Sequence, residues 1–151
     1  ASALAADLQD GLDAIRAQAA AFPRRPRVYF EEWDEPQISG IRWVSELVGV
    51  AGGDDIFPEL AACGLGKDRI IADPLEVVRR APDILFGSWC GKKFSARNVA
   101  ARPGWHDVPA VCERELHEVK SSIILQPGPA ALTDGVRELH RVIAAWATRR
   151  G

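Results

Sequence analysis

The sequence contains no methionine, no apolar run long enough to cross a lipid bilayer and no excess of basic residues. Its 21 acidic residues outnumber its 19 lysines and arginines, and the formal net charge of −2 argues against a protein that binds nucleic acid through a basic face. The first ten residues include acidic residues and no basic segment, so they do not form a secretory signal peptide. Because methionine is missing, we expect a trimmed chain or a piece of a longer one.

Cysteines are few, and their number and spacing do not support a disulfide framework. Cys63, Cys90 and Cys112 are odd in number and form no CxxC pair, so a structural zinc site is not indicated either. Cys112 lies between His106 and His117, but one thiol with two histidines is a weak metal signal, and we expect no metal. With 47% hydrophobic and 26% charged residues, the chain is a globular domain that can bury its own core.

Hydrophobic spacing predicts an α/β fold with a mainly parallel sheet flanked by helices. Helices are expected at residues 3–22, 40–51, 74–80, 95–101 and 129–147. Extended segments are expected between them, at residues 27–32, 70–72, 83–89, 109–111 and 115–119. Ser39 and Ser95 are the expected N-caps of two helices, Gly52 ends the helix before it, and residues 53–67 are expected to be a loop.

Three predicted loops lie beyond the carboxyl ends of strands, where parallel sheets bind ligands. They span Glu31–Ser39, Gly87–Phe94 and Lys120–Pro129. The first is acidic and presents Trp33, whose indole either faces a ligand or packs back on the sheet. The third is rich in proline, and it either offers backbone donors to a ligand or simply connects a strand to a helix.

The second loop resembles a binding site most. Gly87 permits close backbone approach, Trp89 offers a flat face to a planar ligand, and Lys92 and Lys93 could bind an anionic group. The alternative is a tight turn with solvated lysines. The pattern GxxxxGK[ST] is absent, which excludes a nucleotide P-loop.

Cys90, in the same loop, defines an alternative function as a small α/β enzyme with a thiol nucleophile. Such an enzyme needs a histidine base, and His106, His117 and His140 qualify only by elimination, since no catalytic motif surrounds any of them. An unreactive thiol is the favoured interpretation, and we expect no enzymatic activity.

Seven short segments form a distinctive set between about residue 27 and about residue 147. They are RVYFEEW at 27–33, ISGIRWVSEL at 38–47, AGGDDIF at 51–57, PDILFGSWCGKKF at 82–94, VAARPGW at 99–105, VPAV at 108–111 and ILQPGPA at 124–130. Together they resemble the second lobe of ABC-transporter substrate-binding proteins, of the type that binds cobalamin or iron-siderophores.

The resemblance implies two α/β lobes joined by a long rigid helix, with the ligand held between them and delivered unchanged to a membrane permease. Residues 1–26 are then the connecting helix and residues 27–151 the C-terminal ligand-binding lobe. It also implies a periplasmic or other extracytoplasmic location. The implied ligand is cobalamin or a related corrinoid, with an iron-siderophore or haem as the alternative, and no cofactor apart from this ligand is expected.

On this resemblance, particular side chains are expected to contact the ligand. Apolar contacts are assigned to Trp33, Trp43 and Trp89, and polar contacts to Ser39, Ser88, Lys92 and Gln126. The family's lobes also carry acidic residues that dock on the permease. The corresponding neighbourhood, residues 122–129, has no acid, so Glu31, Glu32 and Glu35 are the candidates instead.

A single lobe offers only one wall to a ligand that the family encloses between two. Burial of apolar surface contributes roughly 25 cal/mol per Å², so we expect weak or absent ligand binding by this chain alone. The apolar stripe of residues 3–22 also loses part of its packing surface. We therefore expect a homodimer, formed for example by exchange of the first helix.

Overall fold

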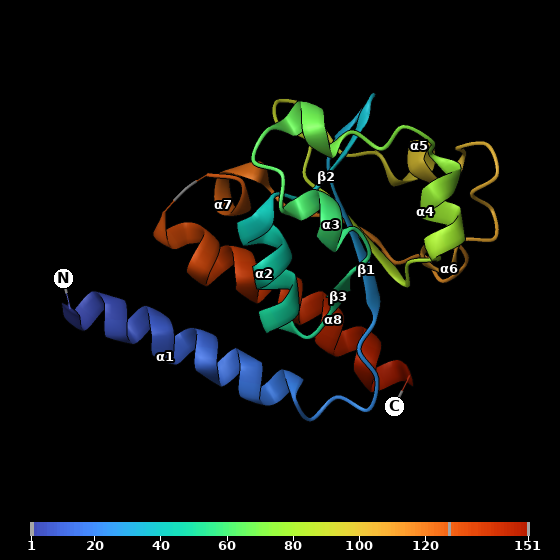
Figure 1. The fold of residues 1–151 in the computed structure, drawn as a ribbon. Coiled ribbons are helices and arrows are strands. Elements are labelled where there is room, and N and C mark those ends of the chain that lie inside the picture. The colour runs from blue at the N-terminus through green and yellow to red at the C-terminus, as the bar shows by residue number, and fades with distance from the viewer. Residues whose placement is uncertain (1, 127, 151) are drawn as a thin grey trace.

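The computed structural model describes residues 2–126 and 128–150, which form a sheet with helices on both faces (Figure 1). The strands are β1 (Arg27–Asp34), β2 (Gln37–Ser39), β3 (Asp54–Asp55), β4 (Ile84–Gly87) and β5 (Leu116–Glu118). The longer helices are α1 (Ser2–Ala19), α2 (Arg42–Ala51), α4 (Leu75–Arg80) and α8 (Val136–Arg150). Shorter turns of helix are α3 (Pro58–Ala61), η1 (Gly66–Arg69), α5 (Ala96–Ala100), α6 (Pro109–Cys112), α7 (Ser121–Ile124) and η2 (Ala131–Gly135).

Strand β1 is the centre of the sheet. It runs parallel to β4 and to the short β3, while β2 returns from it as an antiparallel hairpin, and β4 in turn pairs with β5 in parallel. The sheet order is β2-β1-β4-β5, with β3 beside the first residues of β1. The predicted α/β class with a mainly parallel sheet is therefore confirmed.

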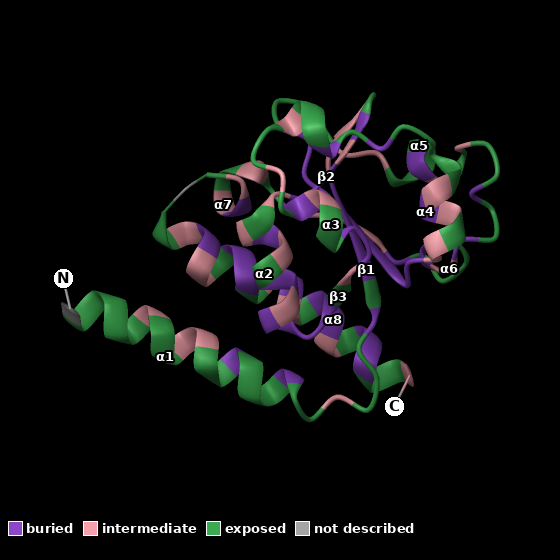
Figure 2. Ribbon diagram, viewed as in Figure 1, coloured by how far each residue is buried: buried purple, intermediate pink, exposed green. Residues whose placement is uncertain are grey.

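Alternation along the strands divides the core into two clusters, one on each face of the sheet. On one face Val28 and Phe30 pack with Ile84 against α2, η2 and α8. On the other face Tyr29 and Leu85 pack with residues of α3 to α6. Figure 2 shows the buried positions concentrated in the strands and in the inward sides of α2 and α8.

Helix α1 lies along the outside of the first cluster. Its last turns bury Ile15 and Ala19 against the body, but its first turns extend beyond it, and Leu4 is 57% exposed. The helix ends at Ala19 rather than at Phe22, and the ring of Phe22 stacks on His140 of α8 at 5.8 Å. Among the described residues no helix combines the length and apolar character that crossing a membrane requires.

Helix α2 corrects one prediction and confirms another. Ser39 is not its N-cap, because Ser39 belongs to β2 and the helix begins at Arg42. The carboxylate of Glu32 serves instead, accepting the backbone N–H of Ile41 at 2.6 Å. Gly52 ends the helix as predicted, with a φ of 111° in the left-handed region.

Two further predictions were wrong, and one was right. Residues 109–111, expected to be extended, form α6, since Pro109 occupies a first helical turn where its missing N–H costs nothing. The expected loop at residues 53–67 contains β3, α3 and the start of η1. The Ser95 cap is confirmed, because its hydroxyl accepts the N–H of Asn98 at 3.2 Å.

Candidate ligand-binding site

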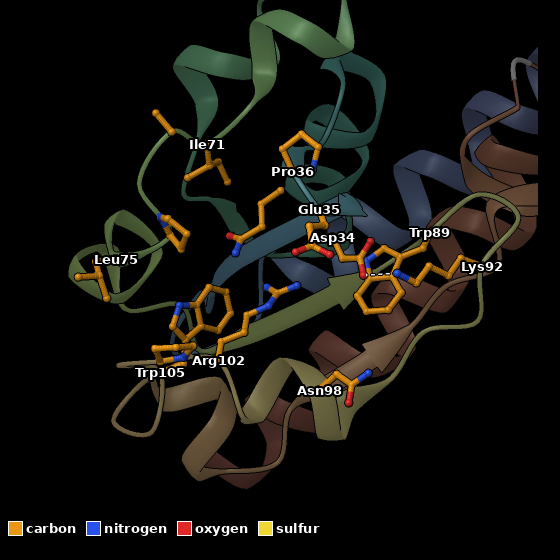
Figure 3. Close-up of a pocket in the computed structure, with 14 residues that line it drawn as sticks. Asp34, Glu35, Pro36, Ile71, Leu75, Trp89, Lys92, Asn98, Arg102 and Trp105 are labelled. Carbon is orange, nitrogen blue, oxygen red and sulfur yellow. Dashed lines mark hydrogen bonds and ion pairs between the residues drawn. The ribbon is translucent and has the colours of Figure 1, made fainter.

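A hollow of about 670 Å³ lies at the carboxyl end of the sheet, beside the second core cluster (Figure 3). Its walls come from the β1–β2 turn, the segment that leads into α4, the loop after β4, and α5 with the segment that follows. The lining residues are Asp34, Glu35, Pro36, Gln37, Ile71, Ala72, Pro74, Leu75, Trp89, Lys92, Asn98, Arg102, Pro103 and Trp105. We call this the main hollow.

A smaller hollow of about 350 Å³ adjoins the main hollow at Trp89 and Lys92, which line both. Its other residues follow β4 and β5, namely Gly91, Lys93, Glu118, Val119, Lys120 and Ser121. We call it the side hollow. The loop after β4 therefore stands between two depressions, at the sheet edge where the sequence predicted ligand binding.

Glu31 holds two lining residues of the main hollow, Arg102 and Trp89, in place by hydrogen bonds. Its carboxylate is fully buried and accepts two hydrogen bonds from Arg102, both at 2.8 Å, one from the Tyr29 hydroxyl at 2.7 Å and one from the Trp89 indole at 3.1 Å. Bidentate charge-assisted bonds of this kind hold both partners in one geometry. Trp89 is consequently tied down by its N–H edge and is only 5% exposed.

Glu31 influences the protonation of both Tyr29 and Arg102. Burial, and then the neighbouring Glu31 carboxylate, raise the pKa of Tyr29 well above its usual value, so the phenol stays a donor. Burial lowers the pKa of Arg102, but the hydrogen bonds and charge of Glu31 outweigh it and the net shift is upward. The guanidinium therefore stays charged while it lines the hollow.

Lys92 lies between Trp33 and Trp89, two of the three tryptophans that were predicted to contact the ligand. Its ammonium lies 5.7 Å from the ring centre of Trp33 and 5.5 Å from that of Trp89, and it donates to Asp34 at 2.6 Å. The indole N–H of Trp33 donates to the carbonyl of Glu35 at 3.1 Å, which pins it to the β1–β2 turn. Trp33 therefore borders the site through Lys92 rather than lining either hollow.

The structure places the other predicted contact residues away from the main hollow. Trp43 donates to the carbonyl of Ile124 at 2.9 Å and packs against the first core cluster, on the opposite face of the sheet. Ser39 is buried beneath Arg69, and Gln126 is exposed after α7. Ser88 is buried after β4, and its hydroxyl has no hydrogen-bond partner among the described residues. Of the seven predicted residues, Trp89 and Lys92 line the hollows.

Several residues of the main hollow were missed at the sequence level. Arg102 and Trp105 stack at 4.6 Å and lie within the RPGW segment that contributed to the family resemblance. That signal could have identified them, because the arginine and the tryptophan directly flank the Pro-Gly pair of this segment. Gln37 carried no such signal, since only the β1–β2 hairpin brings it to the hollow.

Two of the three acids suggested for permease docking are occupied elsewhere. Glu31 is buried against Arg102, and Glu32 forms an ion pair with Arg69 at 3.0 Å while also capping α2. Both carboxylates therefore stabilise the fold, and the suggestion that they dock a partner was wrong in this geometry. Glu35 remains exposed at the β1–β2 turn.

Cys90 is exposed, and within the described residues each histidine finds its partners elsewhere. His117 pairs with Glu115 at 2.7 Å, His140 hydrogen-bonds the Ala51 carbonyl and Gln18, and His106 lies beside Asp107. The arrangement of nucleophile and base that a thiol enzyme needs is absent from residues 2–126 and 128–150.

Comparison with known proteins now identifies the fold. A family described as periplasmic binding protein matches residues 1–122, whereas no match is found among curated proteins. A possible iron-binding periplasmic solute-binding protein from Staphylococcus epidermidis is 18% identical, with a TM-score of 0.78, and the match covers 94% of this chain and 54% of that one.

Two further solved structures bind different ligands on the same fold. The periplasmic vitamin B12 binding protein of Vibrio cholerae is 21% identical with a TM-score of 0.68, covering 95% of this chain and 53% of that one. The periplasmic heme-binding protein from Roseiflexus sp. RS-1 is 23% identical with a TM-score of 0.70, covering 94% and 56%. The chain thus spans about half the length of these proteins, and the family match over residues 1–122 shows that it belongs to the periplasmic binding protein family.

Proposed function

We propose that this chain is the C-terminal ligand-binding lobe of the substrate-binding protein of an ABC importer, and that its ligand is cobalamin or a related corrinoid. Family membership and the match to about half the length of two solved periplasmic binding proteins support the first part. Residues 1–26, mainly α1, then form the connector, and residues 27–151 the lobe. The protein would bind its ligand outside the cytoplasm and pass it unchanged to a permease.

The charge balance of the main hollow is the observation that favours a corrinoid. Lys92 is neutralised by Asp34 and Arg102 by Glu31, which leaves Glu35 as the unbalanced charge among the lining residues. A haem with two propionates, or an anionic siderophore, gains little attraction from such walls. A large neutral ligand rich in amides meets exposed apolar surface from Leu75, Pro74 and Pro103 without a desolvated charge opposite it.

A second candidate ligand is supported by the side hollow. Lys93 lines it with no acidic partner among the described residues, and Lys120 is held only at 3.3 Å by Glu118. An anionic ligand such as haem would bind there through its carboxylates rather than in the main hollow.

Titration calorimetry with cyanocobalamin and with hemin tests these proposals on wild type and three variants. Leu75 lines the main hollow and is 44% exposed, whereas Leu65 is 59% exposed and lines neither hollow, so they form a matched pair. Leu75→Ala should weaken cyanocobalamin binding by about 1 kcal/mol, or roughly fivefold, while Leu65→Ala leaves it unchanged. Equal affinities of the two variants would contradict the proposed site.

The third variant, Lys93→Ala, distinguishes the two ligands. If the ligand is a corrinoid, Lys93→Ala leaves cyanocobalamin binding unchanged and hemin binds no better than nonspecifically. Saturable hemin binding that Lys93→Ala weakens would instead favour the anionic ligand.

A further inference from the structure

We propose that the main hollow contains a subsite for a primary carboxamide, formed by Gln37 and Arg102 with Asp34 and Trp105 beside them. The inference rests on the proposed function, which it deepens by naming the ligand group that is recognised. Corrinoids of the cobalamin type carry carboxamides around the ring, whereas haem carries carboxylates.

Gln37 supplies the first half of the subsite. The residue lines the main hollow and is only 7% exposed, yet its side-chain Oε1 has no hydrogen-bond partner among the described residues. Its backbone is fixed, because it pairs with Asp34 in the hairpin and accepts the N–H of Ile71 at 2.9 Å. A buried amide oxygen without a partner is costly, so this atom is poised to accept a hydrogen bond.

Arg102 supplies the second half. A guanidinium has five N–H donors, and Glu31 takes two of those of Arg102, with no other acceptor for it among the described residues. Figure 3 shows the side chain of Arg102 running between Trp105 and Asp34 along the hollow. Because Glu31 already fixes the orientation of the Arg102 guanidinium, its three other N–H groups can bind a ligand without the entropy cost of ordering the side chain.

Two other polar atoms of the lining add to this pattern. Asp34 Oδ1, an acceptor, and Trp105 Nε1, a donor, are both buried without a partner among the described residues, while the other oxygen of Asp34 bonds Lys92. The hollow therefore offers both acceptors and donors that the protein itself leaves unpaired. A ligand that satisfies them has to both donate and accept hydrogen bonds within this hollow.

A primary carboxamide has this combination, with two N–H donors and one carbonyl acceptor on a small planar group. It can donate to Gln37 Oε1 while its carbonyl accepts from Arg102. A carboxylate has no hydrogen to donate, so it would leave Gln37 Oε1 unpaired and face the Asp34 carboxylate. The lining of the main hollow therefore favours a primary carboxamide over a carboxylate, although the two groups have the same shape.

Nuclear magnetic resonance titration of the chain with propionamide, and in parallel with sodium propionate, tests the subsite. Propionamide should shift the resonances of the Gln37 side-chain amide and the Trp105 indole, and propionate should not. Gln37→Leu should weaken propionamide binding about fivefold, which corresponds to the loss of one hydrogen bond. The control Gln9→Leu, on exposed α1 where Gln9 bonds Asp13, should bind as wild type does.

The inference is overturned if propionamide causes no shift, if propionate shifts the same resonances equally, or if Gln37→Leu behaves as Gln9→Leu does. Where Gln37→Leu does not fold, Gln37→Asn retracts the amide by one methylene and should also weaken binding, and unchanged affinity there counts against the subsite.

Cyanocobalamin separates this inference from the proposed function. If cyanocobalamin binds wild type and Gln37→Leu equally, the subsite falls while the corrinoid proposal stands. If hemin binds saturably and cyanocobalamin does not, while propionamide distinguishes wild type from Gln37→Leu, the subsite stands and the corrinoid proposal falls.

Discussion

Glu31 shows how one residue links the sequence to the site. In the sequence it is one of several acids beside Trp33, and a solvated loop is the simplest interpretation. In the structure it is fully buried, because Arg102, 71 positions later, supplies the opposing charge and Trp89 a further donor. No local pattern can predict such a pairing, since its partners meet only after β1 and β4 have paired.

Replacing Glu31 with Gln tests this role. The variant keeps the shape of the side chain but leaves the largely buried Arg102 without its counter-charge, so the free energy of unfolding should fall by about 3 kcal/mol. Urea denaturation measures the loss. The matched control Glu35→Gln changes an exposed acid of the next turn and should stay within about 0.5 kcal/mol of wild type. Equal stability of the two variants would contradict the role of Glu31 as the counter-charge that stabilises the buried Arg102.

At the scale of elements, most segments of five or more residues were predicted well and most of the shorter ones were missed. The predictions placed α1, α4, α5 and β4 to within three residues, whereas the predicted last helix is divided into η2 and α8. In contrast, α6 and β3 consist of four and two residues, and they adopt their conformation because neighbouring segments supply the hydrogen bonds. The same holds for the N-terminus of α2, whose capping carboxylate comes from β1 rather than from the preceding residue.

The end of α2 provides a test of backbone geometry. Gly52 has a φ of 111°, and a Cβ atom there would lie 2.6 Å from the ring of Phe22, so Gly52→Ala should destabilise the protein by about 2 kcal/mol. Gly11, in α1, has no atom within 4 Å of a built Cβ, and Gly11→Ala should raise stability by about 0.5 kcal/mol. Thermal unfolding of both variants measures the difference, and a destabilised Gly11→Ala would contradict this account of α1.

The ion pairs that join α3 to α4 predict a dependence on pH. Hydrogen bonding to Arg80 lowers the pKa of Glu59 in the folded state. A carboxyl group whose pKa is lower in the folded than in the unfolded state stabilises the fold at any pH above its unfolded-state pKa. This stabilisation is lost as the pH falls through the folded-state pKa. Glu59 is half exposed, so Glu59→Gln should cost about 0.5 kcal/mol or less near pH 7 and nothing near pH 3, as measured by urea denaturation. A difference that persists in acid would contradict this assignment.

At the scale of the whole molecule, family and fold were predictable from the sequence because the resemblance rests on several segments spread along the chain, and the family match confirms it. The candidate site was predictable only in part. The loop after β4 was correctly placed at the carboxyl edge, with Trp89 and Lys92 at the hollows. The rest of the main hollow depends on the β1–β2 hairpin and on the turn after α5, which bring distant segments together.

The exposed first turns of α1 predict that the chain forms a dimer. Leu4 is 57% exposed and Leu8 is half-buried, which leaves an apolar stripe uncovered, and we propose that two copies of the chain cover it in a dimer. Light scattering at high protein concentration should give twice the mass of one chain, and Leu4→Gln should shift the equilibrium towards monomer. A monomeric mass at every concentration would refute the dimer.

We propose that the carboxyl edge around Trp89 and Lys92 is one wall of a corrinoid-binding cleft. Chemical-shift mapping of ¹⁵N-labelled protein with cyanocobalamin tests it most directly. We predict saturable shifts that cluster on the residues of the main hollow, with an affinity weaker than micromolar because the second wall is missing. Shifts confined to the α1–α2 side around Trp43, or none at all, would contradict the site, and nanomolar affinity would contradict the interpretation of this chain as half of a cleft.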